Sequence, residues 1–255
     1  MVISRQQLQV INRRQLRYPL DVAEKDFHLA LALQQLAQSP LRDALVFKGG
    51  TALHHCYLPQ NRFSEDLDFT AVAPGLTGDA VKQALTAGGL FEVRKEFESP
   101  ATIKFERLWY PGILDQPGAI KVEIDRMQNV VLPARTLPYR NVWNLDVTVQ
   151  VMDLREICAE KIRAASQRAR YRDFYDLYLL LTSYTLDLDE VYALIQRKEV
   201  RAEISPALML ANWQLAKDSK ARDLRSIYCA TQVSNDAIET LIRTLAFPPI
   251  LPQSG

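Results

Sequence analysis

Two aspartates that lie one residue apart, Asp66 and Asp68, are the side chains of this sequence best suited to hold a metal ion. The surrounding pattern is typical of a β-strand, and the two-residue repeat of a strand places both carboxylates on one face. Like charges at that spacing repel each other unless a cation compensates them. Mg²⁺ is such a cation, because it binds carboxylates together with water and phosphate oxygens. The alternative interpretation is a solvated edge strand with two exposed aspartates.

A glycine pair precedes the aspartates. A short apolar run ends in Lys48, Gly49 and Gly50, and a helix pattern begins at Thr51. Glycine lacks a Cβ atom, so its backbone can approach a ligand closely, and a helix N-terminus offers free N–H groups to phosphate. The spacing is not that of a Walker A loop, and taken alone Gly-Gly-Thr also fits a tight turn. Its position before the paired aspartates favours the metal site over the solvated strand.

A third carboxylate is expected on a neighbouring strand. Apolar and charged residues alternate over residues 120–125, which places Glu123 and Asp125 on one face of a strand. Either side chain could complete the metal site. Glu123 is preferred because it lies in the middle of the strand, whereas Asp125 lies near its end. The alternative is a half-exposed edge strand whose charged residues point to solvent.

The order of these motifs resembles the AbiEii family of nucleotidyltransferases, part of the DNA polymerase β-like superfamily. This family includes the toxins of type IV toxin–antitoxin systems and the MenT toxins. The first matching blocks are Gly49-Gly50-Thr51 and Arg62-x-Ser64-x-Asp66-Leu67-Asp68-Phe69. The later ones are Ala159-Glu160-Lys161-Ile162-Arg163-Ala164 and Arg172-Asp173-Phe174-Tyr175-Asp176-Leu177. The matches run from about residue 48 to residue 181, roughly half of the chain.

The resemblance implies a role for each matched residue. The residues that would hold a nucleoside triphosphate are Lys48, Gly49, Gly50 and Thr51. The carboxylates that would bind two catalytic Mg²⁺ ions belong to Asp66, Asp68 and Glu123. The phosphate site would be lined by Arg62 and Ser64. The residue that would reach the triphosphate from the helical part is Lys161. The residues that would position this lysine or the nucleotide are Asp173 and Asp176, although Asp173 is equally suited to cap a helix over residues 174–181.

The elements that must position these residues predict an α+β chain. We expect a mixed sheet flanked by helices over residues 1–150, of the nucleotidyltransferase kind, and a helical domain over residues 151–255 that closes a cleft. The expected strands cover residues 44–47, 67–72, 91–98, 102–110, 119–127 and 147–151. Capping-box spacings predict helix starts at Asp21–Glu24 and at Asp153–Glu156. Three or four helices are expected over residues 187–246.

A helix is expected from Leu154 to about Arg168, and the helical pattern over residues 172–181 either continues it or starts a new helix. In an unbroken helix, Lys161, Arg168 and Arg172 share one stripe. A positive stripe opposite a carboxylate cluster suits a metal–triphosphate substrate. The alternative is a solvated charged face, which charge runs usually form.

Composition excludes several other classes of protein. The chain has 255 residues, of which 48% are hydrophobic and 24% charged, which is the balance of an ordinary globular protein. A net charge of +1 excludes a generally basic coat for nucleic acid. Three widely spaced cysteines predict no disulfide framework. His54 and His55 are expected on a helix surface and in packing. Without a signal peptide or a long apolar run, the chain is expected in the cytoplasm, away from membranes.

The expected reaction is metal-dependent nucleotidyl transfer: an acceptor hydroxyl attacks the α-phosphate and pyrophosphate leaves. The resemblance implies a toxin that transfers nucleotides to RNA, such as the 3′ end of a tRNA, with a cognate antitoxin as partner. Alternatives are transfer to a protein or small molecule, and a degenerate module that only binds nucleotide. Candidate RNA contacts are Arg13, Arg14, Arg17, Arg163, Arg168, Arg170 and Arg172.

Overall fold

The computed structural model describes residues 3–198 and 200–252. These residues form two compact units. The first comprises residues 3–59, 64–130 and 134–152, and the second comprises residues 60–63, 131–133 and the described residues from 153 onward. Two short segments that precede residue 150 therefore belong to the second unit. The boundary at residue 150 and the cleft stay predictions.

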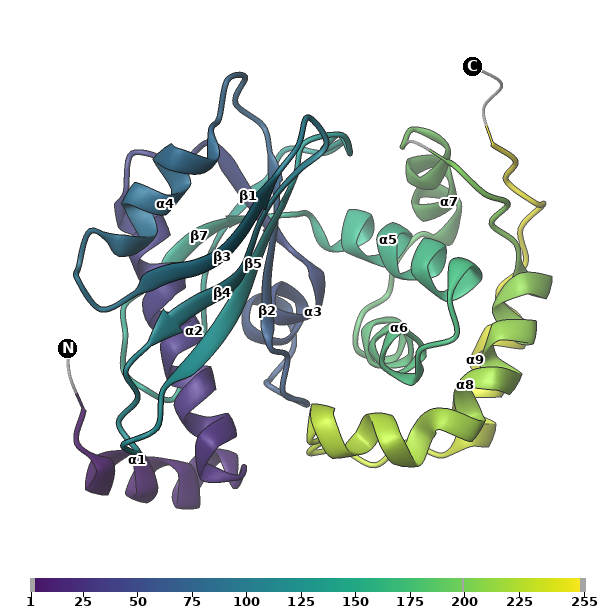
Figure 1. Cartoon of the computed structure of the whole chain (residues 1–255). Helices are drawn as coiled ribbons and strands as arrows, with labels where there is room; N and C mark the ends of the chain where they lie inside the picture. The colour runs from purple at the N-terminus through teal and green to yellow at the C-terminus, as the bar shows by residue number, and fades with distance from the viewer. Residues whose placement is uncertain (1–2, 199, 253–255) are drawn as a thin grey trace. The chain divides into compact units, whose positions relative to one another are not determined.

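A seven-stranded mixed sheet forms the centre of the first unit, with the strand order β3-β4-β5-β2-β1-β7-β6 (Figure 1). Strands β2 and β5 pair in parallel, as do β1 and β7, and the remaining neighbours are antiparallel. The strands are β1 (Leu45–Lys48), β2 (Asp66–Ala71), β3 (Glu92–Glu98), β4 (Thr102–Tyr110), β5 (Gly118–Asp125), β6 (Arg135–Pro138) and β7 (Thr148–Val151).

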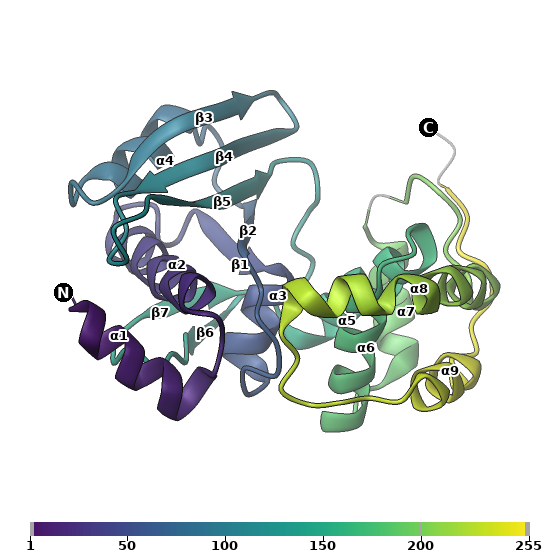
Figure 2. The ribbon, with the colours of Figure 1, turned by 60° about the horizontal axis from the view of Figure 1, so that its bottom comes forward.

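The first unit also contains helical segments. They are α1 (Arg5–Ile11), the π-helical turn η1 (Asn12–Leu16), α2 (Leu20–Gln38), α3 (Gly49–Ala52), the π-helical turn η2 (Leu53–Tyr57) and α4 (Gly78–Thr86). Of these, α2 packs against β2, β5 and β7, and α4 against β3. Helix α2 is buried along most of its length, and alternate residues of β4 and β5 are buried on the same side. Figure 2 shows β3, β4 and β5 side by side at one edge of the sheet, with α4 behind them. The opposite face of these three strands carries exposed and half-buried residues.

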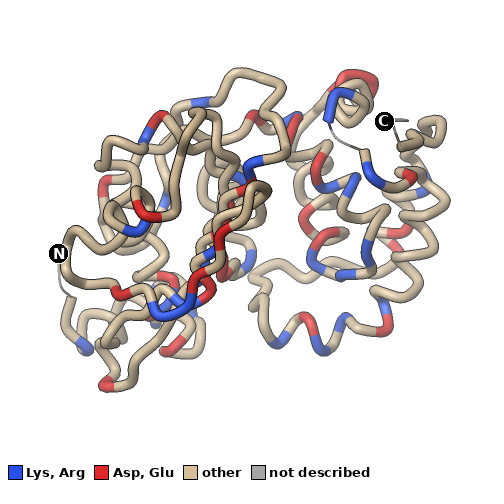
Figure 3. Tube along the Cα trace, turned by 45° about the horizontal axis from the view of Figure 1, so that its top comes forward, with Lys and Arg blue, Asp and Glu red and all other residues tan. Residues whose placement is uncertain are grey.

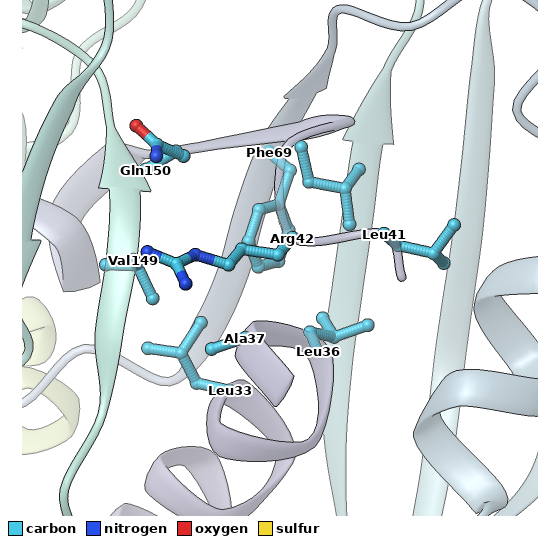
Figure 4. Close-up of a pocket in the computed structure, with 9 residues that line it drawn as sticks. Leu33, Leu36, Ala37, Leu41, Arg42, Phe69, Val149 and Gln150 are labelled. Atoms are coloured by element: carbon cyan, nitrogen blue, oxygen red, sulfur yellow. The ribbon is translucent and has the colours of Figure 1, made fainter. Parts of the chain in front are cut away.

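A small void remains between α2 and the sheet. Leu33, Leu36 and Ala37 of α2 face Phe69 and Val149 across it, and Arg42 lies alongside (Figure 4). With a volume of ~10 Å³ it has room for about one water molecule. It therefore belongs to the packing of the core and has no room for a nucleotide.

The second unit is helical. Its helices are α5 (Leu154–Gln167), α6 (Tyr171–Ser183), α7 (Leu188–Gln196), α8 (Pro206–Ile227) and α9 (Asn235–Thr244). Trp213 is fully buried and packs against the rings of Tyr171 and Phe174. No helix among the described residues is long and apolar enough to cross a membrane. Figure 3 shows lysines and arginines interspersed with aspartates and glutamates along the described chain, as a net charge of +1 suggests.

This architecture confirms the predicted α+β class, but the predicted capping box at the first long helix is wrong. Helix α2 begins after Pro19, and no side chain caps it. Glu24 instead accepts hydrogen bonds from the backbone N–H groups of Ile113 and Leu114, so a distant loop uses the carboxylate that the local pattern assigned to a cap.

The capping box at α5 is half correct. Asp153 caps the helix by accepting a hydrogen bond from Arg155 N. Glu156 turns away from the cap and accepts hydrogen bonds from the backbone of Val131 and Leu132, at 3.0 and 3.1 Å. One of the two segments that join the second unit is thereby fixed to α5.

Candidate active site

Asp66 and Asp68 lie on β2 as the alternation predicts. Leu67 and Phe69 between and after them are buried on the helix-covered side. In the parallel register of β2 and β5, Asp68 lies opposite Glu123, and Asp66 lies opposite Lys121. Residues in register on neighbouring strands share a face of the sheet, so the three predicted metal ligands are brought to one side of two adjacent strands.

The turn between β1 and α3 lies against this group. In the antiparallel pairing of β1 with β2, Lys48 lies opposite Asp68. Gly49 follows with φ of +79°, a conformation that favours glycine. A Cβ atom at Gly49 would lie 2.5 Å from Oδ2 of Asp68, closer than real Cβ contacts allow. The glycine is therefore needed for two reasons: its backbone conformation and its distance from a candidate metal ligand.

Thr51 fixes the start of the helix to β2. Its hydroxyl donates a hydrogen bond to the backbone oxygen of Asp66, and its side chain is buried. The helix that follows is short and continues as a π-helical turn over residues 53–57. His54 and His55 are buried in this turn, and His55 stacks on Tyr139 with ring centroids 4.3 Å apart. Packing was the correct expectation for them, and a helix surface was wrong.

The pKa values of Asp68 and Glu123 are shifted in opposite directions. Burial, together with the charges of Asp66 and Glu123, raises the pKa of Asp68 to about 6. Burial alone would also raise the pKa of Glu123, but ion pairs with Lys121 and Lys104, at 2.7 and 3.0 Å, outweigh it and hold this pKa below its usual value. The raised pKa shows that the negative charge of Asp68 is disfavoured beside two other carboxylates. A divalent cation bound there would reduce the repulsion among the three charges.

Asp125, the alternative third carboxylate, is engaged elsewhere. Its Oδ1 accepts hydrogen bonds from the backbone of Met127 and Gln128, at 2.8 and 3.0 Å, and so closes the turn after β5. Its Oδ2 lies 3.5 Å from Nζ of Lys48. These contacts and the register opposite Asp68 favour Glu123 as the third ligand.

The donor set fits Mg²⁺ in its chemistry, since it consists of carboxylate oxygens on neighbouring strands. Within the described parts of the chain, however, no three His, Cys, Asp or Glu side chains are arranged so as to hold a metal ion. The carboxylate of Glu123 is paired with Lys104 and Lys121.

A buried charge network lies within the second unit. Arg62 is 2% exposed, and its guanidinium donates two hydrogen bonds to the carboxylate of Asp176, at 2.6 and 2.7 Å. Lys161 contacts the same carboxylate at 2.6 Å and Asp173 at 3.3 Å. Arg168 completes the network on Asp173, at 2.7 Å. The late motif and Arg62 of the early motif are thus joined by direct ion pairs.

The geometry of this network agrees with the predicted role of some of its residues and differs from that of others. Lys161 lies against Asp173 and Asp176, as expected of residues that position it. Burial would raise the pKa of Asp173, but Lys161 and Arg168 outweigh it and lower this pKa. Arg62 was predicted to line a phosphate site; its guanidinium is instead occupied by Asp176, which favours an anchoring role. Ser64 is half-buried and belongs to the first unit, whereas Arg62 belongs to the second.

The predicted helix ends close to Arg168 as expected, and of the two arrangements left open for the residues that follow, the structure shows a new helix. Helix α5 ends at Gln167, Arg168 has an extended backbone, and α6 begins at Tyr171. Lys161 and Arg168 still meet at Asp173, through the break rather than along a stripe. Asp173 lies inside the first turn of α6, which begins without a side-chain cap, so a capping role for it is wrong.

Comparison with protein families shows the family to which the chain belongs. The model of the family described as nucleotidyl transferase AbiEii toxin, type IV toxin–antitoxin system, matches residues 31–237. The chain belongs to this family. It is therefore a nucleotidyltransferase toxin of a type IV system, which confirms the family and enzyme class indicated by the motifs. Such a system implies a nucleoside triphosphate as substrate and an antitoxin as partner.

Solved structures agree with this fold. MenT4, a nucleotidyltransferase toxin from Mycobacterium tuberculosis H37Rv, is 23% identical, with a TM-score of 0.65 over 94% of this chain and 90% of that one. JHP933 from Helicobacter pylori is 18% identical, with a TM-score of 0.53 over 86% of this chain and 89% of that one. None of the curated proteins matches the sequence.

Two residues of the candidate site were missed by sequence reasoning. Lys104 and Lys121 flank Glu123 and neutralise it. The alternation that placed Glu123 on the charged face also places Lys121 there, so the sequence pattern could have predicted that the two side chains are neighbours. Lys104 was not, because its position depends on the register between β4 and β5.

Proposed function

We propose that this toxin catalyses metal-dependent nucleotidyl transfer from a nucleoside triphosphate to the 3′ end of an RNA, such as a tRNA. The observation that carries the proposal is the row formed by Asp68 and Glu123 across β2 and β5, with Gly49 packed against Asp68. Carboxylates on adjacent strands beside a helix N-terminus that no side chain caps suit a metal-bound triphosphate.

The nucleotide would be held by the chain around the glycine pair. Backbone N–H groups at Gly49, Gly50 and Thr51 bind the phosphates, and Lys48 adds charge beside Asp68. Asp66, Asp68 and Glu123 would hold Mg²⁺, which when bound supplies activation of the attacking hydroxyl and compensation of developing negative charge. The acceptor oxygen forms a bond to the α-phosphorus, the bond from the α-phosphorus to the bridging oxygen breaks, and pyrophosphate leaves with that oxygen.

Lys161 would supply a further cation for the triphosphate. Its ammonium is held by Asp173 and Asp176, and Arg62 shares the charge of Asp176. An ammonium that is already fixed loses little freedom when a phosphate binds, which is the benefit of preorganisation. Asp173 and Asp176 act in this proposal as positioning residues for Lys161.

Transfer to a protein or a small molecule is the alternative, and a degenerate module that binds nucleotide without reaction is a second one. The test is incubation of the protein with each α-labelled nucleoside triphosphate, Mg²⁺ and total RNA or a cell extract. The proposal expects label in RNA, released by ribonuclease and absent when EDTA replaces Mg²⁺. Label in protein or in small molecules would contradict the RNA acceptor. Nucleotide binding without pyrophosphate release would contradict transfer altogether.

A further inference from the structure

The outer face of β3, β4 and β5, which the helices leave uncovered, continues directly from the candidate metal ligands. Register places one row of residues across four strands: Asp68 on β2, Glu123 on β5, Lys104 on β4 and Phe97 on β3. With about 4.8 Å between neighbouring strands, Phe97 lies roughly 14 Å from Asp68 along this row. The row therefore begins at the candidate site and ends at the edge of the sheet.

The far end of the row is aromatic and exposed. Phe97 is 54% exposed, although a benzyl side chain is usually buried. Trp109 on β4 is half-buried and shares this face, and the guanidinium of Arg94 lies 3.8 Å from the centre of its ring. Exposed aromatic rings and arginine planes are the surfaces on which unpaired bases stack.

Basic side chains lie between these rings and the carboxylates. Lys104 and Lys121 are about one-third exposed and bond Glu123. A bulge in β4 places both Glu106 and Arg107 on the exposed side. Arg107 forms no ion pair with any residue that the structure describes. The exposed pair of Lys95 with Glu106 is of a kind that contributes little and exchanges readily.

We propose that this outer face binds the single-stranded 3′ end of the RNA acceptor. Bases next to the reacting nucleotide stack on Phe97 and on the Arg94–Trp109 pair, while Arg107 and Lys104 contact phosphates. The inference rests on the proposed function and deepens it, because it assigns the acceptor to a surface of this chain. Rings interleaved with cations on an open sheet match an unpaired polynucleotide, whose bases and phosphates alternate in the same way. A duplex hides its bases and gains nothing from the rings.

The experiment measures binding of a fluorescein-labelled single-stranded RNA of twelve nucleotides by anisotropy, with the matching duplex as a second probe. Phe97→Leu keeps an apolar side chain but removes the ring, and Phe97→Trp restores a ring. Arg107→Ala is matched by Arg135→Ala, an exposed strand arginine at the opposite edge of the same sheet. Calorimetric binding of a nonhydrolysable nucleoside triphosphate is measured for every variant.

Because Phe97→Leu removes the ring on which one base stacks, this variant should bind the single strand about tenfold more weakly than the wild type. Phe97→Trp should bind it like the wild type. Arg107→Ala should reduce the slope of log affinity against log salt by about 0.7, and Arg135→Ala should not. Nucleotide binding should be unchanged in all four variants.

Equal affinity of every variant for the single strand would overturn the proposed RNA surface, and so would tighter binding of the duplex. Neither result would contradict the proposed transferase reaction, which the labelling of RNA tests separately. If the wild type labels a protein instead, the RNA acceptor and this surface are both wrong.

Discussion

Asp176 accepts two hydrogen bonds from the Arg62 guanidinium and also contacts the ammonium of Lys161, all in the interior of the second unit. One carboxylate thus compensates two cations that come from distant parts of the sequence. Taking two charges out of water is costly, and only the direct pairing offsets the cost. The relationship explains why an arginine that precedes the paired aspartates is itself buried.

Asp176→Asn should be strongly destabilising, because it leaves Arg62 buried with a neutral partner and Lys161 with Asp173 as its remaining carboxylate. We expect the free energy of unfolding to fall by about 3–5 kcal/mol, measured by urea denaturation followed by circular dichroism. Asp218→Asn, an exposed change on α8, is the control and should stay within about 0.5 kcal/mol of the wild type. A loss of less than about 1 kcal/mol at Asp176 would mean that the network contributes little.

Gly49→Ala tests the contact with Asp68. Gly75→Ala is a matched control, since Gly75 has a φ of +77° and no atom within 4 Å of an added Cβ, whereas Gly49 has a φ of +79° and Asp68 at 2.5 Å. Both variants should lose about 1–2 kcal/mol of stability from the left-handed backbone. Only Gly49→Ala should also lose binding of a nonhydrolysable nucleoside triphosphate, measured by calorimetry. Full binding by Gly49→Ala would separate this turn from the nucleotide site.

Lys161→Ala should weaken nucleotide binding by at least about tenfold, since an ammonium acts on phosphates as a point charge. Its effect on stability should be smaller than that of Asp176→Asn, because Arg62 and Arg168 still compensate the two aspartates. Nucleotide calorimetry and urea denaturation on the same preparation check both statements. Unaltered nucleotide affinity in a folded variant would show that Lys161 serves only the buried network.

His28 should make stability depend on pH. Its ring is buried and stacked on Tyr110, with centroids 3.7 Å apart, and burial lowers its pKa to about 4. In the unfolded chain the ring is protonated as the pH falls below about 6.5, whereas in the folded chain it stays neutral until about pH 4. The neutral ring therefore contributes fully to the free energy of unfolding above pH 6.5, and this contribution is lost as the pH falls toward 4. It amounts to about 3 kcal/mol over that range.

The replacement His28→Phe retains a ring but cannot titrate. Urea denaturation at pH 7 and pH 4.5 should show a smaller loss of stability on acidification for this variant than for the wild type. An identical loss in both proteins would assign the pH dependence to other groups.

Local patterns in the sequence predicted the part of the site that depends on one strand and its neighbour. The alternation around Asp66 and Asp68 fixes which side chains face the core, because a shift of one residue would expose Leu67 and Phe69. The same reasoning placed Glu123 on a charged face. The parallel pairing that brings it opposite Asp68 follows from the topology of the sheet, which no local pattern contains.

What the sequence did not predict depends on partners that are far apart in the chain. Arg62 and Asp176 are separated by 114 residues, and Glu24 bonds a loop 89 residues away. Helix α5 ends at Gln167, next to the predicted end at Arg168, but the hydrogen bonds between Arg168 and Asp173 beyond this end were not predicted.

The most direct test of the account is transfer of label from an α-labelled nucleoside triphosphate by Asp68→Asn and Asp66→Asn, with Mg²⁺ and total RNA. Removing either charge relieves repulsion among the carboxylates, so both variants should fold with stability equal to or slightly above that of the wild type. Transfer should fall by about a hundredfold or more, the scale on which loss of one charge-stabilising group acts. Wild-type transfer by either folded variant would contradict the assignment of these aspartates to the catalytic metal site.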